Sequence, residues 1–374
     1  MKNGRLVSGG LLFLTMFILF ACSNENPQRI ISHKYLDPII KARKEVIVQK
    51  SMDFIPGLSI AVSVDNKLVW SEGMGYASEN LEVPASRETK YRIGDISEIF
   101  TALSYNMLVN KGILQPDSSI QHYIPDFPVK KWKITLRNLV DHSSGIRIAT
   151  ETELHEANYW LTIQRGLTKF MSDSLQFKPG YIQQKSIYNY ILLGAAIERA
   201  VNEDFSKVVD KLVIDTLGLK NTVPDNTFIV IKGKSDFFDH NYISQVINAT
   251  SIDLQYSLPA NGFLSTAEDL NKLGNAFIYP GCISDSLKAQ TFRSDKFESH
   301  APARWVNGWF ISSDKSGKKI YACNSKIVGS GSSLLIYPAD KLVVAVTTNL
   351  TDKYGGMDIF KIAQYFIDFI DQKK

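Results

Sequence analysis

The order in which strand and helix patterns follow one another is the strongest constraint on the fold of this chain. Two runs rich in β-forming residues, 58–64 and 67–72, flank the turn-forming pair Asp65-Asn66 and predict an antiparallel hairpin. Helical spacing of apolar residues dominates from 95 to about 292, and strand-like runs then return at 306–311, 319–323, 332–337 and 342–349. The early and late strands therefore predict one antiparallel sheet, interrupted by a long helical insertion.

Helices at both ends complete this arrangement. Apolar residues recur at helical spacing over 36–48 and over 357–370, and we expect both helices to pack on the sheet. The predicted architecture is an α/β (α+β) fold with two lobes. Residues 31–94 and 301–374 form the sheet lobe, and residues 95–300 form a mostly helical lobe. A ligand site is expected in the cleft between the two lobes.

Local signals set several boundaries inside the helical segment. Apolar residues from Ile96 to Met107 lie on one face of a predicted helix, which Gly112 ends. Helical spacing also predicts helices over 191–201 and 208–217. Ser265, followed three residues later by Glu268, forms a capping-box pattern before another apolar helical run.

The first 22 residues have the composition of an export signal. A positive start precedes an apolar run over 11–20 that is too short to be a comfortable membrane span. The sequence Leu19-Phe20-Ala21-Cys22 resembles a bacterial lipobox. We therefore expect residues 1–22 to be a lipoprotein signal peptide, Cys22 to carry the lipid, and residues 23–30 to form a tether. The alternative is an ordinary cleaved signal peptide with Cys22 incidental. In both cases the body of the protein lies outside the cytoplasm.

The remaining composition excludes several classes of function. The net charge of +4 is small for 374 residues, and no basic stripe with interleaved aromatic residues suggests nucleic-acid binding. No His, Cys or Asp cluster has metal-ligand spacing, so we expect neither a metal nor another cofactor. Cys282 and Cys323 leave a disulfide open, because pairing depends on geometry that spacing does not reveal. Two separate thiols are favoured.

Motifs spread over residues 55–349 occur in an order and spacing typical of one family. They are Ile55-Pro56-Gly57-Leu58, Tyr91-Arg92-Ile93-Gly94, Phe100-Thr101-Ala102-Leu103, Leu139-Val140-Asp141-His142-Ser143-Ser144-Gly145, Pro179-Gly180, Tyr190-Ile191-Leu192-Leu193-Gly194 and Asn261-Gly262-Phe263-Leu264-Ser265-Thr266-Ala267-Glu268-Asp269-Leu270. The chain resembles the β-lactamase-related serine hydrolases, which include AmpC-type β-lactamases, penicillin-binding D-alanyl-D-alanine peptidases and related esterases. The resemblance implies their fold.

The three motifs that carry this family's chemistry are altered here. The resemblance implies a Ser and a Lys one helical turn apart, which attack a carbonyl and help to take the proton; these positions hold Asp95 and Glu98. The second motif, usually Tyr-Ser-Asn, reads Lys185-Ser186-Ile187. The third, Lys-Thr-Gly or His-x-Gly, reads Cys323-Asn324-Ser325. A carboxylate at position 95 cannot be acylated and turned over as Ser would be, and Glu98 removes a cation that assists proton transfer.

Other interpretations of these residues stay open. Asp95 and Glu98 match a capping box, in which Asp95 accepts a first-turn amide and Glu98 reaches back to the Asp95 amide. As the acid and base of a new hydrolase they are poorly spaced, because carboxylates one turn apart do not straddle a substrate bond. Cys323 is a nucleophile or, more simply, a small buried apolar residue. His142 is interpreted as structural rather than catalytic.

Two further Ser-x-x-Lys strings exist outside these motifs. Ser312 to Lys315 and Ser316 to Lys319 fall in a polar stretch around Gly317, between two predicted strands. This context is typical of a hairpin turn rather than of a nucleophile helix. We therefore interpret both strings as turn residues.

These observations predict a lipoprotein of the bacterial cell envelope, periplasmic or surface-exposed, that is anchored to the membrane and whose cleft binds without cleaving. Its ligand would be a small molecule or peptide, with peptidoglycan-derived fragments included, or a protein partner. The alternative is an active serine hydrolase of the β-lactamase, D-Ala-D-Ala peptidase or esterase type that uses non-standard residues. A third hypothesis is a fold retained for assembly with a paralogue. The exchanged charges further predict that the Lys185 ammonium lies near the Asp95 or Glu98 carboxylate and closes the former catalytic centre.

Overall fold

The computed structural model of the protein describes residues 29–293, 297–352 and 357–373. The predicted signal peptide, Cys22 and the tether up to residue 28 lie outside these residues. Within the described residues, none of the helices is long and apolar enough to cross a membrane.

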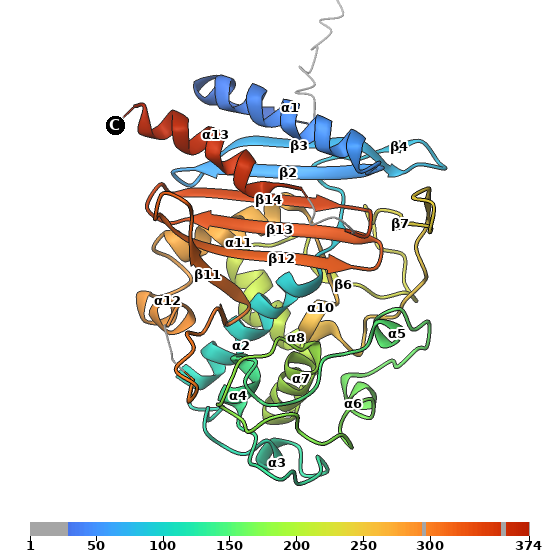
Figure 1. Cartoon of the computed structure of the whole chain (residues 1–374), viewed down its shortest axis with the longest axis vertical. Helices are drawn as coiled ribbons and strands as arrows, with labels where there is room; N and C mark the ends of the chain where they lie inside the picture. Colours follow the sequence, from blue (N-terminus) through green and yellow to red (C-terminus); the bar gives the residue numbers. More distant parts are fainter. Residues whose placement is uncertain (1–28, 294–296, 353–356, 374) are drawn as a thin grey trace, which may run out of the picture.

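One antiparallel sheet joins the two ends of the chain, as the sequence predicts (Figure 1). The hairpin consists of β2 (Gly57–Val64) and β3 (Lys67–Ser78), and β2 pairs with β14 (Leu342–Thr348) from Leu58 to Val64. The strand order is β1-β3-β2-β14-β13-β12-β11-β10, with β4 beside β3. The remaining strands are β1 (Arg29–Ile31), β4 (Val83–Pro84), β10 (Trp305–Val306), β11 (Trp309–Ser313), β12 (Lys319–Ile327) and β13 (Ser330–Tyr337).

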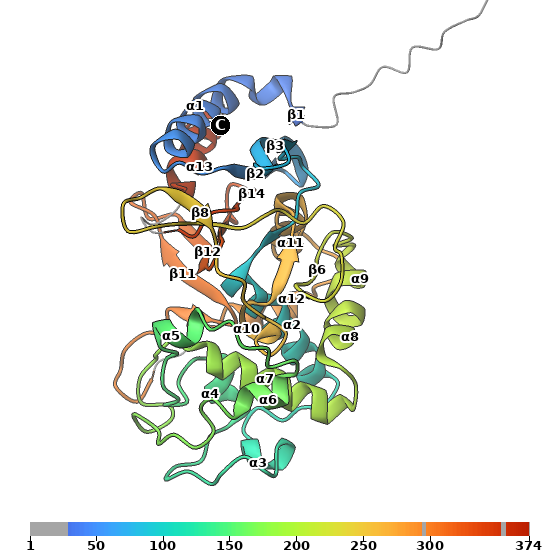
Figure 2. The same ribbon diagram turned by 90° about the vertical axis from the view of Figure 1, so that its right-hand side faces the viewer.

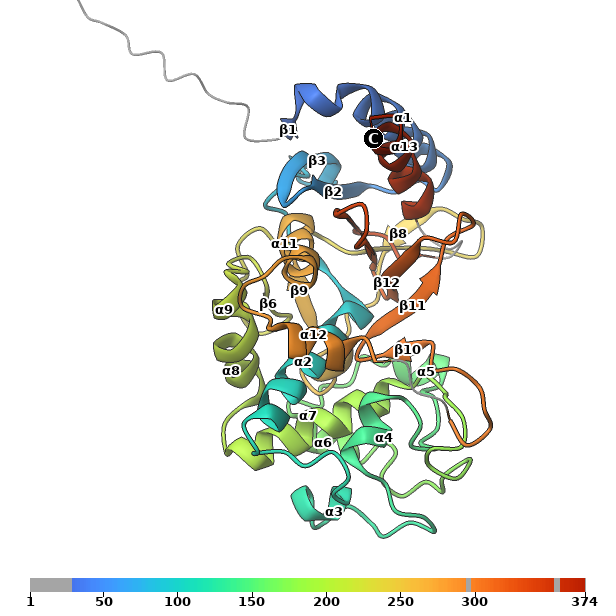
Figure 3. The ribbon, with the colours of Figure 1, turned by 90° about the vertical axis from the view of Figure 1, so that its left-hand side faces the viewer.

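The sheet is covered by helices on both faces. Helices α1 (Leu36–Met52) and α13 (Ile359–Asp371) lie side by side on one face, and α11 (Ala267–Ile278) packs on the other (Figures 2 and 3). Because successive strand residues point to opposite faces, β14 serves both layers. Val344 and Val346 pack in the core beneath α1 and α13, while Val343 and Ala345 pack in the core on the α11 side. A strand buried on both faces explains the continuous apolar run in this part of the sequence.

The prediction of one strand over 306–311 is wrong, because the structure has two separate strands there, β10 and β11. Asn307 and Gly308 have positive φ values of 52° and 81°, and they reverse the chain between β10 and β11. Asn and Gly tolerate this left-handed conformation better than other residues. A Cβ at position 308 would also lie 2.7 Å from the Ile99 amide nitrogen, so the turn packs directly against the start of α2.

Two long helices, α2 (Ser97–Asn110) and α7 (Ile187–Val201), form the centre of the segment between β5 and β10. This segment is less regular than predicted, because loops and short elements connect the long helices. The short helices are α3 (Ile120–Tyr123), α4 (Leu136–Val140), α5 (Glu151–Leu154), α6 (Ile163–Leu167), α8 (Phe205–Val209), α9 (Asp215–Leu217), α10 (Leu258–Asn261) and α12 (Asp285–Thr291). The short strands are β5 (Tyr91–Arg92), β6 (Val223–Pro224), β7 (Phe238–His240), β8 (Val246–Asn248) and β9 (Phe263–Ser265).

Two predicted helix details need correction. The helix predicted over 208–217 is interrupted by a π-helical turn at Asp210–Ile214, between α8 and α9. The cap of α11 is Thr266, whose hydroxyl accepts the Asp269 amide at 3.2 Å, rather than Ser265. Ser265 belongs to β9, and extended pairing there moves the helix start one residue later.

Candidate functional site

The three altered motifs converge where the start of α2 meets β12 and the residues before α7. Asp95 lies in a 3₁₀ turn, Gly94–Ile96, that leads into α2 and contacts β12. The turn is held in place by buried Ile93, Ile96 and Ile99. The structure therefore brings together residues that are far apart in the sequence.

Lys185 bridges the two carboxylates of the first motif, and the predicted ion pair is confirmed. Its Nζ lies 2.6 Å from Asp95 Oδ2 and 3.8 Å from Glu98 Oε2. The side chains of Lys185 and Asp95 are 26% and 24% exposed, whereas that of Glu98 is 1% exposed. Burial alone would lower the pKa of Lys185, but the Asp95 and Glu98 carboxylates outweigh it and raise the pKa above its ordinary value. The ammonium therefore stays charged.

His142 forms a hydrogen bond with Glu98. Its Nδ1 faces two donors, the Ser186 amide at 3.4 Å and Asn189 Nδ2 at 3.2 Å, so this nitrogen is the acceptor. The ring proton is thereby assigned to Nε2, which donates to Glu98 Oε2 at 3.3 Å. Asn189 is oriented in turn by the Ser144 hydroxyl, which donates to its Oδ1. In this cluster two carboxyl groups, those of Asp95 and Glu98, face the single ammonium of Lys185.

The capping-box interpretation of Asp95 and Glu98 is wrong. An N-cap residue needs an extended backbone, but the chain already turns helically at Gly94–Ile96, and α2 has no side-chain cap. The Asp95 carboxylate is engaged by Lys185. The Asp95 amide donates instead to Ser325 Oγ at 2.8 Å, so Glu98 does not reach back to it.

The Ser325 hydroxyl accepts the amide of Asp95, the residue at the family's nucleophile position. In serine hydrolases the backbone amide at the nucleophile position helps to stabilise the oxyanion. Here the equivalent amide, that of Asp95, already has the Ser325 hydroxyl as its acceptor. Gly94, with φ of 48°, allows this contact, because a Cβ there would lie 1.9 Å from Ser325 Oγ.

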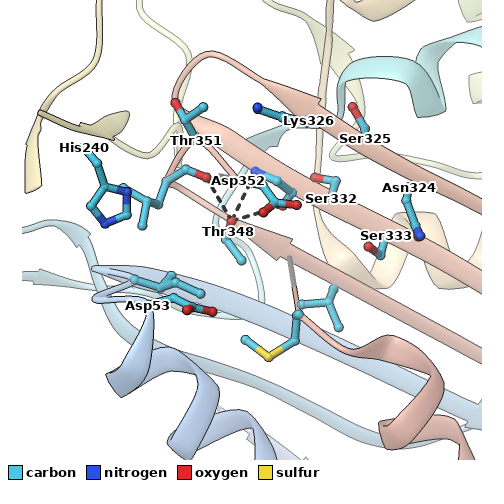
Figure 4. A pocket seen from close by; sticks show the side chains of 15 residues that line it. Asp53, His240, Asn324, Ser325, Lys326, Ser332, Ser333, Thr348, Thr351 and Asp352 are labelled. Carbon is cyan, nitrogen blue, oxygen red and sulfur yellow. Dashed lines mark hydrogen bonds between the residues drawn. The ribbon is translucent and has the colours of Figure 1, made fainter. Parts of the chain in front are cut away.

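The other residues of the second and third motifs have their own partners or surroundings. The Ser186 hydroxyl donates to the Arg147 carbonyl at 2.6 Å, and the residue is buried. Cys323 is also buried, and burial raises the pKa of its thiol well above the ordinary value. Ile187 lines the cleft. Asn324 lines a second pocket on the side of the sheet that α13 covers (Figure 4).

The remaining candidates lie outside this cluster. Cys282 and Cys323 are both free thiols. Cys282 is exposed and Cys323 is buried, so the two do not form a disulfide. Ser312, Lys315, Ser316 and Lys319 lie on or between β11 and β12. Both Ser-x-x-Lys strings are therefore in the hairpin, as interpreted.

A cavity of about 500 Å³ opens beside the ion pair. Asp95, Lys185, Ser186 and Ile187 contribute to its wall, and Asn261 from the end of α10 also lines it. Asn261 and Asn189 were missed as site residues, because the sequence marks Asn261 only as the first residue of a family motif and gives no signal for Asn189. Among the described residues, no group of His, Cys, Asp or Glu is arranged to hold a metal ion.

The sheet, its helical layers and a cleft at the start of α2 define the class of fold. The chain superposes on the octameric penicillin-binding protein homologue from Pyrococcus abyssi with a TM-score of 0.76, at 21% identity, over 89% of this chain and 77% of that one. At this identity the likeness shows the fold alone. The family model Beta-lactamase matches residues 45–365, and the chain belongs to the β-lactamase family.

Two relatives illustrate the range of this family. The human mitochondrial serine beta-lactamase-like protein LACTB is 30% identical over 293 residues, which cover 60% of this chain and 53% of the relative. Protein flp of Staphylococcus aureus (strain COL) is 25% identical over 310 residues, which cover 80% and 61%. The chain thus spans about half to three-fifths of the length of these relatives.

Proposed function

We propose that this protein is a non-catalytic member of the β-lactamase family that binds a ligand or partner at the bacterial cell envelope. The observation that carries the proposal is the Lys185 ammonium, 2.6 Å from Asp95 and 3.8 Å from Glu98, at the positions of the family's nucleophile and base. The ion pair takes the place of the groups that would start an acyl transfer.

Each step of that reaction lacks a competent group. Asp95 replaces the hydroxyl nucleophile, and the raised pKa of Lys185 keeps its ammonium protonated, so it is no general base. The Asp95 amide already donates to Ser325. Among the residues of the altered motifs, Ser186 and Cys323 are the nucleophiles that an active hydrolase with other residues could use. The first donates its proton to a backbone carbonyl, and the second is a buried thiol whose pKa is raised.

We expect the purified protein neither to turn over a chromogenic cephalosporin nor to be labelled by a fluorescent penicillin or a fluorophosphonate. The physical reason is that Asp95 occupies the nucleophile position and that the Ser186 hydroxyl donates its proton to a backbone carbonyl. The measurement is absorbance for turnover and in-gel fluorescence for labelling, with an active penicillin-binding D-Ala-D-Ala peptidase as the positive control. Labelling that Ser186→Ala or Cys323→Ala removes would establish an active hydrolase with that residue as nucleophile.

The envelope location rests on the lipobox-like sequence that ends at Cys22. Metabolic labelling with an alkyne palmitate analogue should tag the full-length protein, and Cys22→Ala should abolish the tag. Cys282→Ala is the matched control: it removes an exposed thiol and should leave the tag intact. A tag that depends on Cys282 instead, or an untagged wild type, would count against lipidation at Cys22.

A further inference from the structure

The cavity beside the ion pair adjoins a second one. His240, Lys326 and Thr351 line both, the first with a volume of about 500 Å³ and the second with about 360 Å³. The second pocket lies by the ends of β12, β13 and β14, and Asp53 and Asp352 contribute to its wall (Figure 4). We call the two cavities together the double cleft. Two adjoining cavities that share lining residues can take an extended ligand.

Acidic side chains dominate the larger cavity. They are Asp95, Glu151, Glu153, Glu156, Asp239 and Asp253. Three of them have a Lys or Arg partner: Asp95 pairs with Lys185, Glu153 with Arg147 and Glu156 with Lys169. In the part of the chain that the structure describes, Asp239 and Asp253 have no ion-pair partner, and the remaining basic lining residues are Lys326, His155 and His240. The excess charge on this wall is negative.

Asp253 lies in the wall of the larger cavity in a buried position. It is 2% exposed, and its carboxylate accepts the amides of Trp160, Leu161 and Gln255. Hydrogen bonds from amides favour the charged form of a carboxylate.

An unsatisfied amide provides an independent observation. Asn261 lines the larger cavity, is 7% exposed, and its Oδ1 has no hydrogen-bond partner among the described residues. A buried acceptor left without a donor is unfavourable. Because rotation about χ2 exchanges the amide oxygen and nitrogen, the side chain can present its acceptor to a donor in the cavity.

The smaller cavity is also lined by acidic residues, Asp53 and Asp352. Burial raises the pKa of Asp53, the Asp352 carboxylate raises it further, and His240 opposes the increase. Two carboxylates in one pocket favour a positively charged group beside them. Acidic groups therefore lie along both parts of the double cleft.

We propose that the double cleft binds an extended ligand that carries an ammonium group, such as a peptide with a free amine. The ammonium is attracted by Asp239 and Asp253, and one of its N–H groups, or a backbone N–H of the ligand, donates to Asn261 Oδ1. This inference deepens the proposed function and rests on it, since the cleft binds the amine without chemistry.

A matched set of peptides tests the sign of the charge. The probes are N-acetyl-Ala-Lys-Ala-amide, the same peptide with the lysine amine acetylated, and the same peptide with that amine succinylated. Isothermal titration calorimetry at pH 7 should give an affinity about tenfold or more higher for the ammonium peptide than for the neutral one. The succinylated peptide should bind more weakly than the neutral one. Salt should weaken the binding of the ammonium peptide selectively.

Variants locate the binding to this cleft. Asp239→Asn and Asn261→Ala should each lower the affinity for the ammonium peptide by about three- to tenfold. Asp37→Asn makes the same charge change at the start of α1, outside the double cleft, and should leave the affinity unchanged. Thermal unfolding checks that each variant is folded. Asp239→Asn keeps the test valid if Asn261→Ala fails to fold, because the amide oxygen of the new side chain can still accept the His240 amide.

Three outcomes would overturn the inference: equal or tighter binding of the succinylated peptide, no effect of either cleft variant, or no binding of any peptide at millimolar concentration. Failure of the proposed function is distinguishable from these, because it appears as penicillin labelling or cephalosporin turnover. The acetylated and amidated peptides report charge preference whether or not the protein is catalytic.

Discussion

Replacing Lys185 with methionine should lower the free energy of unfolding by about 3 kcal/mol at neutral pH. Methionine keeps much of the side-chain length but leaves two carboxylates, Asp95 and the 1% exposed Glu98, without their cation. Glu98 Oε1 already lacks a hydrogen-bond partner among the described residues, so this oxygen has no donor that could compensate for the lost ammonium. Urea unfolding followed by circular dichroism measures the change.

The matched control for this substitution is Lys211→Met. Lys211 pairs with Glu203 on the surface and is 63% exposed, so its loss should cost about 0–1 kcal/mol. A double-mutant cycle with Asp95→Asn isolates the pair, for which we expect a coupling energy of about 1–3 kcal/mol. A cycle without coupling would show that the 2.6 Å contact contributes nothing to stability.

The decrease in the free energy of unfolding caused by Lys185→Met should depend on pH. Burial and the neighbouring Glu98 already raise the pKa of Asp95 in the presence of Lys185, and removing the ammonium raises it further. A carboxyl whose pKa is higher in the folded than in the unfolded state destabilises the fold above its folded pKa, and this effect is lost below its unfolded pKa of about 4. Acidification should therefore reduce the difference between Lys185→Met and the wild type.

Arg92→Met should destabilise the protein by about 3–5 kcal/mol, because it breaks a buried ion pair. Arg92 Nε lies 2.8 Å from Asp225 Oδ2, with side chains 4% and 1% exposed. The guanidinium also donates to the Val328 carbonyl at 2.8 Å and lies over the Phe237 ring. The substitution leaves Asp225 with Lys234 as its remaining cation partner among the described residues.

Arg137→Met provides the same chemical change on the surface. Arg137 and Asp117 are 43% and 75% exposed, and loss of this pair should cost about 0–1 kcal/mol. Urea unfolding of both variants measures the difference. Equal effects of the two substitutions would mean that burial adds nothing to the Arg92 contact and would contradict the prediction.

The sheet and the ion pair at the start of α2 were predictable because both depend on strong patterns. β-forming residues on both sides of the Asp65-Asn66 turn predict the β2–β3 hairpin, and the long apolar run of β14 is typical of a strand buried on both faces. The Lys185–Asp95 contact follows from complementary charges at positions that one family brings together. The spacing between the motifs in the sequence was sufficient to assign Asp95, Glu98 and Lys185 to these positions.

Details that depend on backbone conformation were not predictable. Asp95 matches an N-cap by residue type, but the 3₁₀ turn at Gly94–Ile96 moves it inside the helical turn and gives its amide to Ser325. The reversal at Asn307-Gly308 lies within a β-forming run that hides it. Asn261 gains its importance from an unpaired oxygen, which a sequence pattern cannot reveal.

The pairing of β2 with β14 also governs when the molecule can fold. β2 is synthesised long before its neighbour, and the chain between them must close a very long loop before these contacts form. Until then the hairpin keeps one bare edge, open to pairing with another molecule. A chain that ends before β14 therefore lacks the strand that completes its sheet.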